Sequence, residues 1–133
     1  MVLDWSTFVT LRLNEHALHT WDIELTFGPT ATVPESAAAV LVDTIGLLAG
    51  FAGKPNPAIA PIRVTTVDPR RKFRLALGPD SVSLTPGAAG LPDLTLPAES
   101  LVRLITGRLD AAHTPTVAGN AYLDALRTSF PGM

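Results

Sequence analysis

Three short segments in the middle of the chain alternate apolar and polar residues with the two-residue period of a β-strand. They occupy residues 62–67, 73–77 and 81–85, and a fourth short apolar segment follows at 93–96. Successive side chains of a strand point to opposite faces, so these segments favour a sheet with one buried face. We therefore expect a small antiparallel sheet of about four strands, with one face covered by helices.

Segments with helical patterns lie on both sides of the expected strands. The first runs from about Asp4 or Ser6 to Leu25, with Asp4, Ser6 and Thr7 available for capping, and the second from Pro34 to about Ala49. Two more follow the strands, over 97–107 and 120–129. Strands grouped together, with helices segregated from them, are typical of an α+β domain. The expected fold is two N-terminal helices, the sheet and two C-terminal helices.

The composition restricts the classes of function. The chain has 133 residues, of which 47% are hydrophobic, enough for the core of one domain. A formal net charge of −2 gives no electrostatic reason to expect a nucleic-acid partner. Cysteine is absent, which excludes disulfides, thiolate metal sites and cysteine nucleophiles.

No segment has the pattern of a membrane anchor or a secretory leader. The longest apolar run, residues 37–51, contains Asp43 and Thr44 and is shorter than the roughly 20 residues of a membrane-spanning helix. The first residues do not form a charged segment followed by an apolar one, as a secretory signal would. We expect a cytoplasmic protein that does not contact membranes.

The first helical segment carries the most distinctive group of ionisable side chains. Glu15 and His19 are four residues apart and so neighbours on a helix, and Asp22 lies one turn further along the same stripe. This stripe borders the apolar face. Carboxylate and imidazole groups are ordinary zinc ligands, and Asp22 could orient the His19 ring from the second shell. The alternative is a solvated Glu–His pair worth a few tenths of a kcal/mol.

Other candidates for chemistry are weaker. His113 lies in an expected loop. An exposed histidine without a catalytic role is a simpler interpretation there than a lone acid–base group. The chain contains neither the Gly-x-Ser-x-Gly motif of serine hydrolases nor a P-loop. Four arginines could line a pocket for an acidic ligand, although strand arginines usually form the solvated face of a half-covered sheet. They are Arg63, Arg74, Arg103 and Arg108.

The segment 11–23 resembles the last helix of the metal-binding bundle in the mycothiol-dependent maleylpyruvate isomerase family. In that family a DinB-like four-helix bundle precedes a smaller α+β domain, and the helix carries a glutamate, a histidine four residues later and then an aspartate. Glu15, His19 and Asp22 match this pattern. The resemblance implies that Glu15 and His19 bind a divalent metal such as zinc, and that mycothiol is a cofactor. The family's further histidine ligand comes from an earlier helix, which we do not expect before Met1.

The rest of the chain resembles the C-terminal domain of the same family, which is related to sterol-carrier-protein-like folds. The segments that carry the resemblance are 62–67, 97–108 and 117–126. The resemblance implies two parts: residues 1–30, the last helix of a DinB-like bundle, and residues 31–133, the C-terminal α+β domain.

Three functions remain open. The first is a binding or assembly module, the C-terminal portion of an isomerase-like protein without activity of its own. The second is an oligomeric metalloprotein or enzyme in which Glu15 and His19 of several chains build a metal site. The third is a carrier of a small apolar ligand, by analogy of fold. A homo-oligomer is expected because the first helix has more large apolar side chains than one neighbouring helix can cover. These are Trp5, Phe8, Leu11, Leu18, Trp21 and Leu25.

Overall fold

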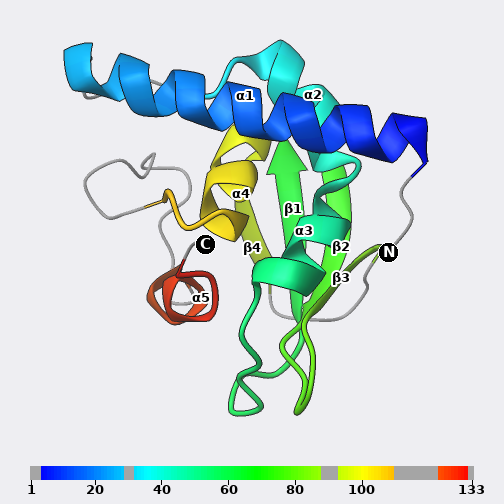
Figure 1. Ribbon diagram of the computed structural model, residues 1–133. Helices are drawn as coiled ribbons and strands as arrows, with labels where there is room; N and C mark the ends of the chain where they lie inside the picture. Colours follow the sequence, from blue (N-terminus) through cyan, green and yellow to red (C-terminus); the bar gives the residue numbers. More distant parts are fainter. Residues whose placement is uncertain (1–3, 29–31, 88–92, 110–122, 132–133) are drawn as a thin grey trace.

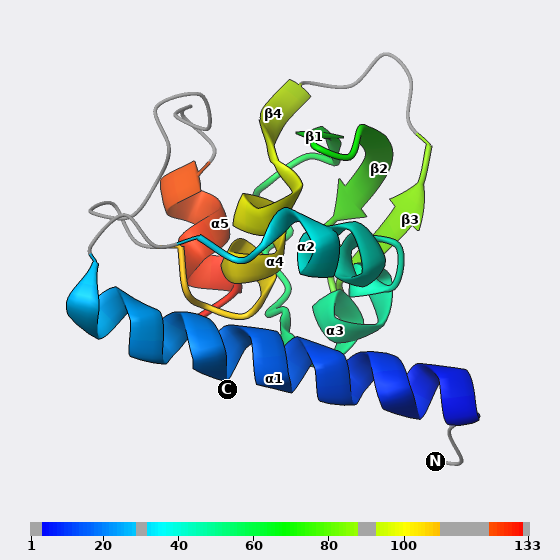
Figure 2. The ribbon, with the colours of Figure 1, turned by 90° about the horizontal axis from the view of Figure 1, so that it is seen from above.

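The computed structural model describes residues 4–28, 32–87, 93–109 and 123–131. Its longest element is helix α1 (Trp5–Phe27), which lies across the top of the molecule in Figure 1. Seen from above, α1 is the outermost element, and α2, α3 and α4 lie between it and the sheet (Figure 2). The helices therefore cover one face of the sheet, as expected for an α+β fold. The other elements are α2 (Glu35–Val42), α3 (Ile45–Ala52), β1 (Ile62–Val67), β2 (Arg71–Ala76), β3 (Ser83–Pro86), β4 (Asp93–Pro97), α4 (Ala98–Ile105) and α5 (Leu123–Ser129).

The ends of α1 follow from its capping residues. Asp4 is the N-cap, and its Oδ1 accepts a hydrogen bond of 2.7 Å from the backbone N–H of Thr7. This bond lowers the pKa of Asp4 because it stabilises the ionised carboxylate. At the other end, Gly28 adopts an extended conformation, and its N–H still bonds the Glu24 carbonyl at 2.9 Å. The helix was expected from the sequence, and Asp4 is one of the three residues that the sequence offered for its cap.

The single helix expected over 34–49 is two helices instead, which corrects the number of N-terminal helices to three. The chain bends by 72° between α2 and α3. At the bend, both the backbone N–H and the hydroxyl of Thr44 bond the Leu41 carbonyl, at 3.1 and 3.2 Å. Such local hydrogen bonds compete with continuation of a helix. Among the described residues no single helix is long and apolar enough to cross a membrane, and only this bent pair together has the length and composition.

The bend lets α3 pack directly on the sheet. A Cβ atom on Gly46 would lie 2.6 Å from the Leu84 carbonyl oxygen, so only glycine fits at this contact between α3 and β3. The preceding helix, α2, packs mainly on α4 and also touches α1. Because the helix breaks here, α3 can pack on the sheet while α2 packs on α4 and α1.

The sheet has the strand order β3-β2-β1-β4. The β1–β2 and β2–β3 pairs are antiparallel, as expected, but β4 pairs with β1 in parallel. The sheet is mixed, which corrects the expected antiparallel sheet. The sequence could not reveal this, because alternation of apolar and polar residues is the same in parallel and antiparallel strands and reports only which face is buried.

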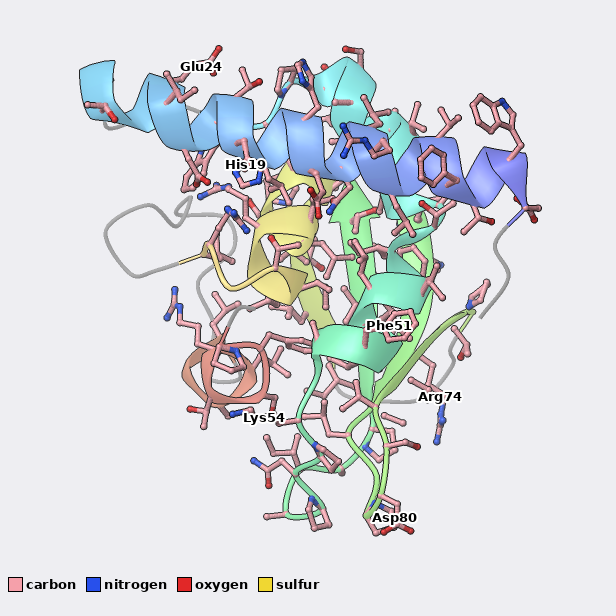
Figure 3. All side chains as sticks on the ribbon, in the orientation of Figure 1. His19, Glu24, Phe51, Lys54, Arg74 and Asp80 are labelled. Atoms are coloured by element: carbon pink, nitrogen blue, oxygen red, sulfur yellow. The ribbon has the colours of Figure 1, made fainter. Side chains whose placement is uncertain are left out.

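The two faces of the sheet differ strongly in character. The inner face is apolar, and its central residues, Val64 and Leu94, are neighbours in register and fully buried. The outer face carries Arg63 and Arg74, which are paired across β1 and β2. Arg74 is exposed and projects away from the helices in Figure 3. The buried side chains of the inner face are Ile62, Val64, Thr66, Phe73, Leu75, Leu84, Leu94 and Leu96.

The two C-terminal helices, α4 and α5, are held to the rest of the molecule by different contacts. Every residue of α4 is buried, and the helix lies between β1 and β4 on one side and α2 on the other. The described part of the last expected helix is α5. Two hydrogen bonds of 2.7 Å hold it, from Lys54 N–H to the Ser129 carbonyl and from Arg127 Nε to the Leu109 carbonyl.

Candidate functional site

A buried ion pair lies within α4. The Nε and Nη2 atoms of Arg103 donate to the two carboxylate oxygens of Glu99 at 2.7 and 2.8 Å. The Ser100 hydroxyl and the Val33 N–H also donate to this carboxylate, at 2.7 and 3.3 Å. Arg103 is only 1% exposed. Both charges are compensated inside the protein, so this group stabilises structure and does not have the character of an anion-binding site.

The ion pair also supports α1. The guanidinium carbon of Arg103 lies 5.3 Å from the centre of the Trp21 ring, a cation–π contact between α4 and α1. Trp21 is 4% exposed and packs in the same core as Ala17 and Leu18. From the sequence alone, Arg103 was one of four arginines that could line a pocket for an acidic ligand. The structure corrects this, because Arg103 is buried between Glu99 and Trp21.

The predicted metal ligands lie on the exposed edge of α1. Glu15 and His19 line a small cavity of about 160 Å³ with Arg108, which comes from the segment after α4. His19 is 67% exposed at its side chain and lies along the lower edge of α1, on the side of α4, in Figure 3. The other lining residues are Asn14, Leu18 and Thr106. The structure thus brings together the two predicted ligands and one of the four arginines considered from the sequence.

Asp22 has two neighbours at this edge. Its Oδ2 lies 3.6 Å from Nδ1 of His19, beyond the distance of a hydrogen bond that would orient the ring. Its shorter contacts are to Arg108, whose Nε and Nη2 donate to the two carboxylate oxygens at 3.1 Å each. Asp22 therefore anchors α1 to the segment after α4 and has a long contact to His19.

The described residues of one chain do not provide a complete donor set for a metal. The part of the chain that the structure describes contains no group of three His, Asp or Glu side chains placed to hold a metal ion. Glu15 and His19 supply two ligands, whereas a structural zinc site needs four and a catalytic site three with an open position. Because Asp22 is occupied by Arg108, it does not complete the set.

A larger cavity lies beneath the N-terminal half of α1. It has a volume of about 520 Å³ and is bounded by α1, the bend between α2 and α3, and strands β2 and β3. Asn14 is 5% exposed and lines both this cavity and the smaller one. Its Oδ1 is buried with no hydrogen-bond partner. The sequence analysis missed Asn14, although its place four residues before Leu18 and seven before Trp21 puts it on the buried face of the helix.

The remaining candidate from the sequence, His113, lies outside the described residues. Comparison with known proteins adds no assignment: no family model, no curated protein and no solved structure matches this chain. The resemblance to the isomerase family therefore depends on the residues of the chain themselves.

Proposed function

We propose that this chain is the C-terminal portion of a protein resembling mycothiol-dependent maleylpyruvate isomerases, and that it acts as a binding and assembly module. The observation that carries the proposal is the shared position of Glu15, His19 and Arg108 around one cavity. Two candidate metal ligands from α1 and a cation from the α+β body meet at the junction between them. A metal bound there would act as a Lewis acid toward an anionic molecule, while Arg108 stays paired with Asp22 and positions the edge of the cavity.

The attachment of α1 to the body supports this role. The Asp22–Arg108 contact and the Trp21–Arg103 contact both hold the half of the helix that carries His19. These contacts fix the direction in which the ligands face. A ligand pair on a rigid element loses less entropy on metal binding than a pair on a mobile segment.

The exposed face of α1 supports assembly with a second copy. Trp5 and Ile23 are 77% and 64% exposed, and Phe8 and Val9 are exposed beside them. Trp5 stacks on Phe8 with ring centres 5.8 Å apart. Ile23 follows Trp5 by 18 residues, about five helical turns, and so points in the same direction. Pairing of two copies of α1 would cover these side chains, and two Glu15–His19 pairs would provide four zinc ligands.

Zinc titration with simultaneous measurement of the molar mass tests the proposal. We expect about one zinc ion for two chains, and loss of binding in Glu15→Gln and in His19→Ala. The matched control is His16→Ala, because His16 lies about 100° round the helix from Glu15 and should not reach the same ion. Asp22→Asn should weaken zinc binding by about tenfold, because Asp22 is proposed to orient the His19 ring. Unchanged affinity in Asp22→Asn, with binding lost in Glu15→Gln, would remove Asp22 from the site. Zinc binding that survives in both Glu15→Gln and His19→Ala would contradict the proposal.

The proposal also makes a statement about activity. A single chain that contributes two ligands should not isomerise maleylpyruvate, with or without added mycothiol and zinc. The measurement is an isomerase assay on the purified chain. Turnover that disappears in His19→Ala would favour the alternative, an oligomeric enzyme assembled from this chain alone.

A further inference from the structure

The cavity of about 520 Å³ beneath the N-terminal half of α1 has the size of a small-molecule site. Its walls are mainly apolar, with Leu11 from α1, Leu47 from α3, and Phe73 and Leu84 from the sheet. Such walls gain free energy when an apolar molecule displaces water from them. Size and lining together indicate an occupant with a largely hydrocarbon body.

The polar atoms of the lining are mainly hydrogen-bond acceptors. The hydroxyls of Thr10 and Thr44 donate to the carbonyls of Ser6 and Leu41, at 2.9 and 3.2 Å, so that only their lone pairs remain available. Asp4 contributes a carboxylate whose pKa is lowered by its bond to the Thr7 N–H, and which is therefore ionised at neutral pH. A ligand that carries a carboxylate would bring its charge close to these acceptors.

Asn14 supplies the acceptor for which the structure shows no partner. Its Oδ1 is buried without a hydrogen bond in a side chain that is 5% exposed and borders the cavity. Buried polar atoms are nearly always hydrogen-bonded, so an unpaired one next to a cavity suggests a partner that is supplied from outside the chain. Because Oδ1 itself is enclosed, a rotation of the Asn14 amide would bring it to an O–H or N–H group of a ligand in the cavity.

We propose that this cavity binds a small, mainly apolar molecule that carries a hydrogen-bond donor, an alcohol or phenol, and that Asn14 accepts its hydrogen bond. The site does not include Glu15 or His19, although Asn14 borders both cavities, so binding here does not require a metal and is measured without one.

The test compares three ligands of similar size and different hydrogen-bonding groups. They are 2-naphthol, 2-methoxynaphthalene and 2-naphthoate, titrated at neutral pH by calorimetry. We expect 2-naphthol to bind at least about tenfold more tightly than either of the others, because only it offers a neutral donor. Equal affinity for all three, or no binding of 2-naphthol, would overturn the proposal.

Two variants locate the site. Asn14→Leu removes the acceptor and keeps the side-chain volume, so the preference for 2-naphthol over 2-methoxynaphthalene should disappear. Leu47→Trp fills the cavity from a half-buried position, and it should weaken binding of 2-naphthol about tenfold or more. Arg74→Gln, on the outer face of the sheet, is the control and should bind like the wild type. A preference that survives in folded Asn14→Leu would contradict the assignment. If that variant does not fold, unchanged binding in Leu47→Trp contradicts it.

Discussion

The two halves of α1 belong to one continuous helix but are held in different ways. The C-terminal half is seated on the body, with Ala17, Leu18 and Trp21 buried and Asp22 paired to Arg108. The N-terminal half extends over a cavity, and its Trp5 and Phe8 are exposed. The C-terminal half thus attaches the helix to the body. The N-terminal half has a cavity on its inner side and exposed apolar side chains on its outer side. We infer that the C-terminal half contributes most of the stability and carries the candidate metal ligand His19, whereas the N-terminal half borders the cavity proposed for a small molecule.

The largest effect should come from breaking the buried ion pair below the anchored half. Arg103→Ala would leave the Glu99 carboxylate buried without its partner, which costs about 3–5 kcal/mol of the free energy of unfolding. It also removes the contact to Trp21. Urea denaturation at neutral pH measures the loss. Arg74→Ala is the control on the open face of the sheet and should change the stability by less than about 0.5 kcal/mol. A loss below about 1 kcal/mol in Arg103→Ala would show that the pair is not important for stability.

Substitution of each tryptophan compares how much the two halves of α1 contribute to the free energy of unfolding. Trp21→Ala removes a buried ring and should cost about 3 kcal/mol or more. Trp5→Ala removes a ring that is 77% exposed and should change the stability of the monomer by less than about 0.5 kcal/mol. Both variants should be measured by urea denaturation in the Ile23→Glu background, which removes contacts between copies of α1, and at the same protein concentration. Equal losses would contradict the division of α1 into an anchored and an open half.

The contact between Asp22 and Arg108 should have a smaller effect. Both side chains are partly exposed, so the pair is screened by solvent, and Asp22→Asn should cost about 0.2–1 kcal/mol. The cost should shrink further at high salt, because the interaction is electrostatic. Thermal denaturation at low and high salt checks this expectation. A loss of stability that does not depend on salt would indicate that Asp22 acts through packing and not through its charge.

The smallest effect concerns the cap at the start of α1. The bond from the Thr7 N–H lowers the pKa of Asp4 in the folded protein, so the carboxylate stabilises the helix while it is ionised. This stabilisation should be fully present above the unfolded pKa of about 4 and should be lost as the pH falls through the lowered folded value. Asp4→Ala should remove the corresponding part of the pH dependence. An unchanged pH profile of the melting temperature would contradict the role of the cap.

Much of the fold could be predicted from local patterns. The α+β class, the Asp4 cap, the antiparallel β1–β2–β3 arrangement and the helix after Pro97 all follow from residue periodicity and capping chemistry. The parallel pairing of β4 could not be predicted, because strand direction depends on contacts distant in sequence. The break at Asp43 and Thr44 was also missed. Asp43 turns outward to Arg71, with an Oδ1–Nε distance of 2.7 Å, which is a contact across 28 residues.

The candidate site was only partly predictable. The spacing of Glu15 and His19 placed both on one edge of α1, and the structure adds Arg108 to the same cavity. Arg108 is 89 residues from His19 in the sequence and appears there only because the chain returns to α1 after α4. Asn14 was missed because a single uncharged amide between Leu13 and Glu15 gives no signal of a binding site. Its spacing to Leu18 and Trp21 indicates burial, but the cavity beside it depends on how α1 lies on the body.

The most direct test of the proposed assembly is the molar mass of the purified chain in solution at micromolar concentration, measured by light scattering. The chain has a mass of 14.0 kDa, and we expect a species of at least twice this mass, held together through α1. A variant with Phe8→Glu and Ile23→Glu should lower the mass to that of one chain while retaining the fold, because both side chains are exposed in the monomer. A monodisperse 14.0 kDa species for the wild type, with or without zinc, would contradict assembly through α1.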